Sequence, residues 1–326
     1  MRILVTGGAG YIGSVTAEML LAAGHSVAVL DNLSRGHRDA VPPGARLVIG
    51  DVRDGEQAAE LMRRERIDCV MHFSASSLVG ESMVHPGRYF GNNVIGVIRL
   101  LQAMQAAGVG RFIFSSSAAV YGEPERVPIV EDDAVRPTNP YGESKATAER
   151  FLEWYRRLHG LRYATLRYFN AAGASAERGE DHAPETHLIP LALQAAAGER
   201  AALQVYGRDY PTADGTCVRD YIHVCDLADA HIRALDRLDA LERATFNLGN
   251  GEGYSVLEVV GAVERVTGCA VPVEDAPRRS GDPARLVASA DRARESLAWV
   301  PQRGRLDEIV ADAWNWKQRF PRGYRR

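Results

Sequence analysis

Residues 2–13 read Arg2-Ile3-Leu4-Val5-Thr6-Gly7-Gly8-Ala9-Gly10-Tyr11-Ile12-Gly13. The glycines fit G-x-G-x-x-G when counted from Gly8 and G-x-x-G-x-x-G when counted from Gly7. In such a turn one glycine permits the tight bend, one lets the backbone approach a pyrophosphate, and one lets the helix pack closely on the strand. An apolar run precedes the turn and a helical pattern follows it, so we predict a dinucleotide site with the pyrophosphate at the helix N-terminus.

Asp31 points to the type of dinucleotide. It ends the second apolar run, 18 residues after Gly13. A carboxylate there accepts from ribose hydroxyls and repels a 2′-phosphate, so we predict NAD rather than NADP. Asp51, after the third run, is a second candidate, directed at the adenine; taken alone it would be a loop carboxylate or a helix cap. The competing interpretation of the whole stretch is a glycine-rich turn that merely connects a strand to a helix.

The first half of the chain alternates apolar runs with helical patterns. The runs are 3–5, 27–30, 47–49, 69–71, 112–114 and 164–166, and the helical stretches are 11–23, 54–65, 87–107 and 141–159. Nearly continuous apolar runs are typical of strands covered on both faces. Strands that alternate with helices predict an α/β fold with a doubly wound (Rossmann) parallel sheet.

The rhythm changes after residue 171, where Ala, Gly, Glu and Pro become frequent. We expect an NAD-binding Rossmann domain over 1–171 and a smaller C-terminal α/β substrate-binding domain over 172–326. Within the latter, 218–250 either stays there or returns to the first domain. We expect short strands at 203–206 and 246–249 and helices at 226–238, 255–267 and 305–319. Asp226 and Ser255 are the expected N-caps of the first two of these helices.

Composition narrows the classes of partner. The chain has 326 residues, of which 46% are hydrophobic and 25% charged, and a formal net charge of −3. There is no basic excess for a nucleic acid. No signal peptide and no run of about 18 apolar residues is visible, so we expect no membrane segment. Four cysteines without a Cys-x-x-Cys pair favour a cytoplasmic protein with reduced thiols. No His, Cys or carboxylate set shows metal-ligand spacing, so we expect no metal.

Two segments carry candidate chemistry. Tyr141 and Lys145 lie four residues apart and share a face if their segment is helical, with Pro140 near the first helical position. A nearby ammonium, together with a positively charged nicotinamide ring, would lower the pKa of the tyrosine from its free value of about 10. Ser117 closes the stretch Phe114-Ser115-Ser116-Ser117 at the C-terminal end of a predicted strand, the edge where doubly wound folds bind ligands. Its hydroxyl could hold the reacting oxygen of a substrate near Tyr141. Each motif alone also occurs by chance.

Taken together, these motifs resemble those of the extended short-chain dehydrogenase/reductases, and among them most closely the UDP-glucose 4-epimerases. The resemblance covers essentially the whole chain. It is carried by the glycine turn, Tyr141-x-x-x-Lys145 and the segments 80–82, 92–94, 115–122, 167–170, 209–212, 219–224, 247–249 and 277–282. Related dehydratases carry an acid directly after the hydroxyl residue, whereas Ala118 follows Ser117 here, which argues against dehydration.

The resemblance implies a role for each matching residue. Catalysis falls to Tyr141, Lys145 and Ser117. The cofactor would be bound by Gly7, Gly10, Tyr11, Ile12, Gly13, Asp31, Asn32, Asp51, Val52, Phe73, Ala75, Asn92, Tyr141, Lys145 and Phe169. The UDP-sugar would be bound by Ser117, Tyr141, Asn170, His187, Leu188, Tyr206, Arg219, Arg279 and Asp282. His187 stands where other members have asparagine, and Leu286 occupies a position that often controls room beside the sugar's 2-substituent.

Several alternatives stay open. The sugar could instead be a UDP-pentose of the arabinose/xylose type or a UDP-N-acetylhexosamine. A net oxidoreductase of the same fold would release NADH at each turnover. A cofactor-binding protein without catalysis is disfavoured because Ser117, Tyr141 and Lys145 are all intact. The resemblance also implies a homodimer through the helices near 87–107 and 141–159.

Overall fold

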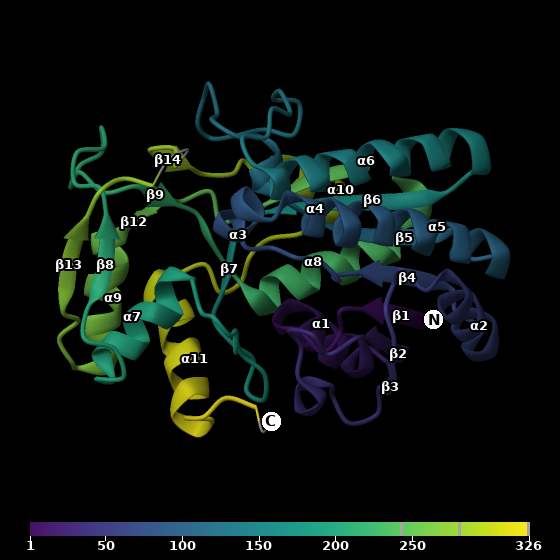
Figure 1. The fold of residues 1–326 in the computed structure, drawn as a ribbon, viewed down its shortest axis with the longest axis horizontal. Coiled ribbons are helices and arrows are strands. Elements are labelled where there is room, and N and C mark those ends of the chain that lie inside the picture. Colours follow the sequence, from purple (N-terminus) through teal and green to yellow (C-terminus); the bar gives the residue numbers. More distant parts are fainter. Residues whose placement is uncertain (242–243, 280–281, 325–326) are drawn as a thin grey trace.

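The structure, a computed structural model, describes residues 1–241, 244–279 and 282–324 (Figure 1). Its centre is a seven-stranded parallel sheet in the order β11-β6-β5-β4-β1-β2-β3. The strands are β1 (Arg2–Thr6), β2 (Ser26–Asp31), β3 (Arg46–Ile49), β4 (Cys69–His72), β5 (Arg111–Ser117), β6 (Arg162–Tyr168) and β11 (Thr245–Leu248). The order reverses beside β1, which is the point where doubly wound sheets bind ligands. The predicted fold class is confirmed.

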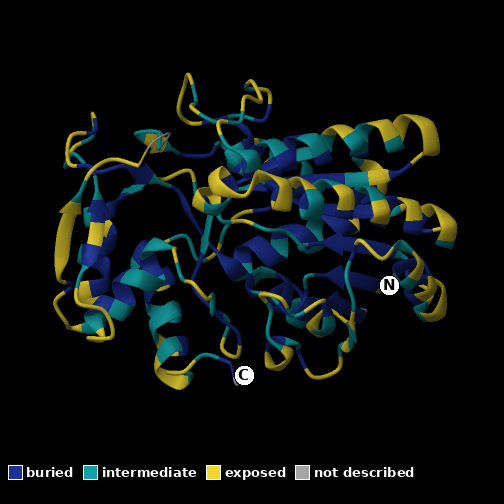
Figure 2. Ribbon diagram, in the orientation of Figure 1, coloured by how far each residue is buried: buried dark blue, intermediate teal, exposed yellow. Residues whose placement is uncertain are grey.

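Helices cover both faces of this sheet. The helices of this part are α1 (Tyr11–Ala22), α2 (Gly55–Glu65), α3 (Val79–Val84), α4 (Pro86–Tyr89), α5 (Gly96–Ala107), α6 (Pro140–His159), α8 (Val224–Arg237) and α10 (Asp291–Leu297). Successive residues of β1 point to opposite faces: Ile3 and Val5 join the core under α1 and α8, and Leu4 joins the core under α2 and α5. The sheet is therefore buried on both sides (Figure 2), as its continuous apolar runs require.

A smaller lobe lies beyond the carboxyl ends of the strands, on the left of Figure 1. Its elements are β8 (Leu203–Tyr206), β9 (Val218–Arg219), β12 (Tyr254–Ser255), β13 (Val273–Ala276), β14 (Arg285–Leu286), α7 (Leu188–Ala196), α9 (Val256–Thr267) and α11 (Leu306–Arg319). Its core joins apolar side chains of α7, α9 and α11. β7 (Asn170–Ala172) and β10 (Tyr221–His223) pair in parallel at the junction. Four short 3-10 or π segments, at 38–40, 90–95, 118–120 and 238–240, complete the described elements.

Most predicted helices and strands appear within two residues of their expected bounds, and two differ in an instructive way. The expected N-cap Asp226 is wrong: α8 begins two residues earlier, and the ring of His223 accepts a hydrogen bond from the backbone of Cys225. Asp226 instead accepts from the backbone of Arg303. The expected helix 87–107 is not one regular helix, because a π-helical segment over Phe90–Ile95 interrupts it.

Strand β11 and helix α8, both inside residues 218–250, pack on the first sheet and its helices. The division of the chain at residue 171 stays a prediction. In the part of the chain that the structure describes, no helix combines the length and the apolar character needed to cross a membrane.

Candidate active site

The glycine turn joins β1 to α1. Gly7 has φ of 73°, and a Cβ there would lie 2.6 Å from the backbone nitrogen of Ser74. A Cβ on Gly13 would collide with the carbonyl oxygen of Gly7. Helix α1 starts after Gly10 with no side-chain cap and no acidic residue in its first turn. These features leave an uncapped helix N-terminus beside bare backbone, which is what a pyrophosphate requires.

Three acidic or amide side chains border this turn. Asp31 is buried, and its carboxylate accepts from the backbone of Ala9 at 3.0 Å and of Leu33 at 2.8 Å. Burial raises its pKa above the ordinary value. Asn32 donates to Asp51 at 3.0 Å, and Asp51 also pairs with the guanidinium of Arg53 at 2.7 Å.

Hydrogen bonding from Arg53 lowers the pKa of Asp51, so this carboxylate is already engaged within the chain. Val52, beside it, is buried in the core under α2. Both residues were expected near the adenine, and that role stays a prediction.

The three candidate catalytic residues come from β5 and α6. Ser117 ends β5, and Asn139 caps α6 by accepting from the backbone of Gly142 at 2.9 Å. Pro140 occupies the first turn, as expected, so the helix begins just ahead of Tyr141. One turn later, the Lys145 ammonium donates to the carbonyl of Ser115 at 2.7 Å. The cap and the lysine contact together place Tyr141 and Lys145 beside the carboxyl end of β5.

The electrostatics of this group differ in part from expectation. Burial raises the pKa of Tyr141 above its usual value, and hydrogen bonding with Ser117 opposes the rise. Burial lowers the pKa of Lys145 to about 7, and Glu149 opposes the fall. In the chain by itself, the lysine therefore does not give Tyr141 the lowered pKa that the sequence predicts. That prediction also required the positive charge of a nicotinamide ring, which a bound cofactor and not the protein would supply.

A buried ion pair lies directly behind β5. Arg167 on β6 and Glu149 on α6 approach to 2.6 Å, with side chains only 7% and 12% exposed. Ser116, next to Ser117, donates to the same carboxylate at 2.5 Å. The remaining guanidinium nitrogen of Arg167 donates to the phenol of Tyr121 at 2.9 Å. The pair thus ties α6, β5 and β6 together at the catalytic end of the sheet.

Asn93 is a residue of this region that sequence reasoning passed over. It lies in the π-helical segment, is 2% exposed, and binds both backbone groups of Ser76 at 2.8 and 2.9 Å. It also donates to the hydroxyl of Ser144 at 2.9 Å. The neighbouring Asn92, an expected cofactor contact, donates to the Asn93 oxygen at 3.1 Å. Asn93 therefore holds the loop after β4 against the catalytic helix.

The remaining expected contacts on the cofactor side lie around the same sheet edge. Phe73 follows β4 and packs 4.7 Å from the ring of His231, and Ala75 follows it in the half-buried loop. Phe169 follows β6 and packs with Ala118 in one apolar cluster, against which Leu286 of β14 also packs. A residue of the smaller lobe thus packs on the same apolar cluster as Ala118 and Phe169.

The expected substrate residues of the smaller lobe form two pairs. Arg219 donates to Asp282 at 3.0 Å, and the guanidinium of Arg279 lies 3.9 Å from the ring centroid of Tyr206. The charges of both arginines and of Asp282 act on the pKa of the Cys217 thiol, so the two pairs border one region. Of the motif 277–282 that carried the resemblance here, Ser280 and Gly281 lie outside the described residues.

The loop between β7 and α7 holds the other expected contacts. Asn170 binds the carbonyl of Asp220 at 2.9 Å, and His187 precedes Leu188 at the start of α7. The ring of His187 pairs with Glu180 at 2.7 Å and Glu185 at 2.9 Å. The charge of Glu180 raises the pKa of His187 well above its usual value.

The same loop corrects one premise of the sequence analysis. Glu180, His182, Glu185 and His187 form a set that could hold a metal ion, although we found no such spacing in the sequence. Their irregular spacing of two, three and two residues matches no regular helical or strand period. Only the folded loop brings their ligand atoms together.

Comparison with known proteins identifies the family. The model of the NAD dependent epimerase/dehydratase family matches residues 3–249. The chain belongs to this family. The UDP-glucose 4-epimerase of Streptomyces lividans is 54% identical over 99% of this chain and 98% of its own, and that of Lacticaseibacillus casei is 52% identical over 99% of each. The crystal structure of UDP-glucose 4-epimerase from Brucella ovis in complex with NAD is 48% identical, with a TM-score of 0.93 over 96% of this chain and 97% of that one.

Proposed function

We propose that this protein is a UDP-glucose 4-epimerase that interconverts UDP-galactose and UDP-glucose through a 4-keto sugar, with NAD held tightly. One observation carries the proposal. Ser117, Tyr141 and Lys145 gather at the carboxyl end of β5, in a chain about half identical over its full length to proteins of that name.

The chain fits the cofactor. The turn at Gly7 and Gly13 has no room for side chains, and the uncapped start of α1 offers free amides to a pyrophosphate. Asp31, at the end of β2, offers a carboxylate for the adenosine ribose, with Tyr11 and Ile12 at the helix start for the pyrophosphate. Bound NAD would take up the hydride from C4 of the sugar and return it to the opposite face. The cofactor is regenerated in each cycle, so it has no need to leave.

The side chains of the protein divide the proton chemistry. Tyr141, once ionised, removes the proton from the sugar 4-hydroxyl, and Ser117 holds that oxygen by a hydrogen bond. The Ser117 hydroxyl lies close enough to Tyr141 to oppose the rise in its pKa, so one hydroxyl can bridge the phenol and the sugar. Lys145, fixed by the carbonyl of Ser115, would hold the nicotinamide ribose.

The smaller lobe holds the nucleotide. Arg219 and Arg279 pair with the phosphates, since a guanidinium fork matches phosphate oxygens. Asp282 takes a uridine ribose hydroxyl and Tyr206 lies against the uracil. Asn170, His187 and Leu188 approach the diphosphate and the sugar from the junction. The diphosphate is held firmly and the hexose loosely, which lets the 4-keto sugar turn over.

The identity of the sugar rests partly on Leu286. It packs against the apolar cluster that contains Ala118 and Phe169, which supports its expected position beside the sugar. UDP-pentose and UDP-N-acetylhexosamine substrates are the alternatives. A net oxidoreductase would instead show a steady rise in NADH absorbance with excess NAD.

We also propose that the protein is a cytoplasmic homodimer. Three elements that pack together, α3, the π-helical segment and α6, expose large apolar side chains: Val79, Met83, Val84, Phe90, Ile95, Trp154 and Leu158. Such a surface favours a homodimer. Four free cysteines favour the reducing cytoplasm.

Replacement of Tyr141 tests the proposal. Tyr141→Phe removes the proton acceptor, so turnover of UDP-galactose should fall by at least about 100-fold. NAD released by denaturation should stay at the wild-type amount per chain, because the phenol is not needed to hold the dinucleotide. Tyr155→Phe, on the same helix, should keep full activity. Retained turnover in Tyr141→Phe would sink the assignment.

A further inference from the structure

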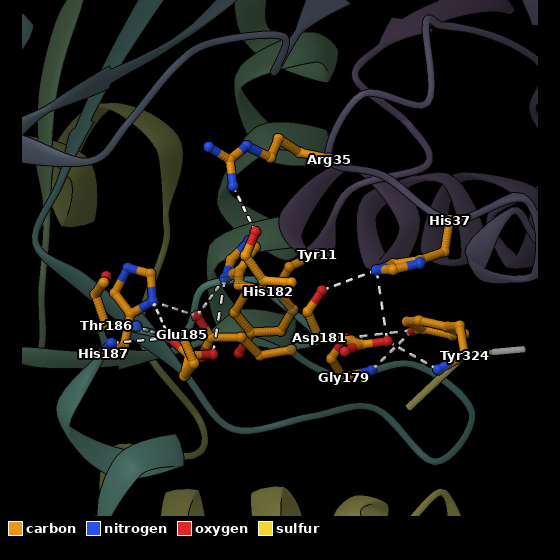
Figure 3. A network of polar contacts seen from close by, with 12 residues as sticks. Tyr11, Arg35, His37, Gly179, Asp181, His182, Glu185, Thr186, His187 and Tyr324 are labelled. Atoms are coloured by element: carbon orange, nitrogen blue, oxygen red, sulfur yellow. Dashed lines mark hydrogen bonds and ion pairs between the residues drawn. The ribbon is translucent and has the colours of Figure 1, made fainter. Parts of the chain in front are cut away.

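Four side chains of the loop between β7 and α7 converge on one point. The Nδ1 atoms of His182 and His187 lie 3.0 and 2.7 Å from the same oxygen, Oε1 of Glu180. Glu185 closes the group, with Oε1 at 2.9 Å from Nδ1 of His187 and Oε2 at 4.0 Å from Nδ1 of His182. One ligand atom from each residue lies within 4.8 Å of all the others. Figure 3 shows His182, Glu185 and His187 facing one another.

The charge of this cluster is not balanced by a permanent cation. The side chains of Glu180 and Glu185 are each only 7% exposed. Within residues 1–241, 244–279 and 282–324, neither carboxylate has a lysine or arginine partner; the two histidines are their only basic partners. Two carboxylates withdrawn from water require compensating positive charge. Protonated rings of His182 and His187 supply it in the metal-free chain, and a single divalent cation at the point of convergence supplies it when it replaces those protons.

We propose that Glu180, His182, Glu185 and His187 form a binding site for a divalent transition-metal ion, with Zn²⁺ as the preferred ion. Two imidazole nitrogens and two carboxylate oxygens are ligands that zinc accepts in four-coordinate tetrahedral sites. Zinc–ligand bonds of about 2.0–2.2 Å place neighbouring ligand atoms about 3.4 Å apart. The four carboxylate–imidazole distances, 2.7 to 4.0 Å, bracket that value, and no two ligand atoms lie more than 4.8 Å apart. Shifts of less than about 1 Å therefore complete the site.

The site has the features of a structural metal centre. All four ligands come from the protein, within eight residues, which leaves no position open for substrate. Glu180, His182 and Glu185 line a pocket between β7, α7 and α11, through which an ion can enter.

The ion would secure the loop at the place where the two lobes meet. The ring of His182 lies edge-on to Tyr11 of the glycine turn at 6.4 Å, and Tyr11 donates to the carbonyl of Gly173 at the start of the same loop. His187 would bind the metal through Nδ1 and keep Nε2 free to face the substrate. Metal binding would thus orient a proposed substrate contact without taking part in the reaction.

Zinc titration of the chelator-treated full-length protein tests the site. Calorimetry should show one Zn²⁺ per chain, mass spectrometry should count the same zinc after gel filtration, and the melting temperature should rise with saturation. His182→Asn should weaken the affinity by at least about 100-fold, and Glu185→Gln should do the same if the first variant folds poorly. His159→Asn, which removes an exposed histidine elsewhere, should bind as the wild type does.

Absence of stoichiometric zinc in the wild type would overturn the proposal. Equal zinc binding by wild type, His182→Asn and Glu185→Gln would overturn it as well, because the ion would then sit elsewhere. Neither readout involves NAD or a sugar nucleotide. The metal site and the proposed epimerase activity can therefore fail independently.

Discussion

The buried pair of Glu149 and Arg167 allows a prediction of stability at the catalytic end of the sheet. In Glu149→Gln the guanidinium, 7% exposed, loses the negative charge at 2.6 Å, while its bonds to the phenol of Tyr121 and the carbonyl of Glu131 remain. Removal of one partner of a buried ion pair costs about 3–5 kcal/mol. Glutamine retains an oxygen that accepts from Arg167 or Ser116, so we expect the lower end, a loss of about 3 kcal/mol in the free energy of unfolding.

Urea unfolding followed by circular dichroism measures this loss, and the same helix provides the control. Glu153 pairs with Arg156 and Arg157 at the surface, with side chains 32%, 53% and 59% exposed. Exposed pairs of this kind contribute about 0–1 kcal/mol, so Glu153→Gln should change stability little. Equal losses in Glu149→Gln and Glu153→Gln would refute the claim that burial makes the inner pair different.

Three further predictions concern the site. Gly7→Ala should abolish NAD retention, because Gly7 has a positive φ and a Cβ there would collide with the backbone that follows β4. Gly24 also has a positive φ, but the space around its Cβ is open, so Gly24→Ala should retain NAD. The NAD released by denaturation measures both variants. Burial lowers the pKa of Lys145 to about 7 and Glu149 opposes this, so the ammonium is lost as pH rises through that value. Turnover should fall on the alkaline side, and in Glu149→Gln the pH–rate profile should fall at lower pH; an unchanged profile would contradict the role of the ammonium. Leu286→Ala should raise kcat/KM for UDP-N-acetylglucosamine relative to UDP-glucose by about tenfold, since one to two methylenes of space are worth roughly 1–3 kcal/mol; an unchanged ratio would place Leu286 away from the sugar.

The elements of the first lobe could be predicted because their signals lie within short stretches of sequence. A glycine turn between a strand and a helix admits few structures, and continuous apolar runs indicate strands buried on both faces. The start of α6 followed in the same way, because Asn139 and Pro140 suit only the first positions of a helix. These signals depend on neighbours in the chain.

Features that depend on distant neighbours were harder to predict. Helix α8 starts at Val224, where the ring of His223 caps it. Asp226 does not cap the helix, because its carboxylate accepts a hydrogen bond from the backbone of Arg303. Asn93 hydrogen-bonds to Ser76 and Ser144, and nothing in its own segment indicates those partners.

The cluster at Glu180 is a further case, since a loop without periodicity brings its ligand atoms together. In the chain alone, burial raises the pKa of Tyr141 by more than hydrogen bonding with Ser117 lowers it, and a sequence does not show burial directly. The lower pKa expected beside a charged nicotinamide ring stays a prediction. The contacts of Asp226 and Asn93 join segments that are distant in the sequence, whereas the cluster at Glu180 depends on how one loop folds.

Proton NMR of the purified protein with UDP-galactose, and no added cofactor, tests the central claim most directly. We expect the anomeric signal of UDP-glucose to appear while no net NADH accumulates, which would establish 4-epimerisation with resident NAD. An absence of conversion, even after NAD is added, would contradict the hexose assignment and leave pentose and N-acetylhexosamine nucleotides as the substrates to test.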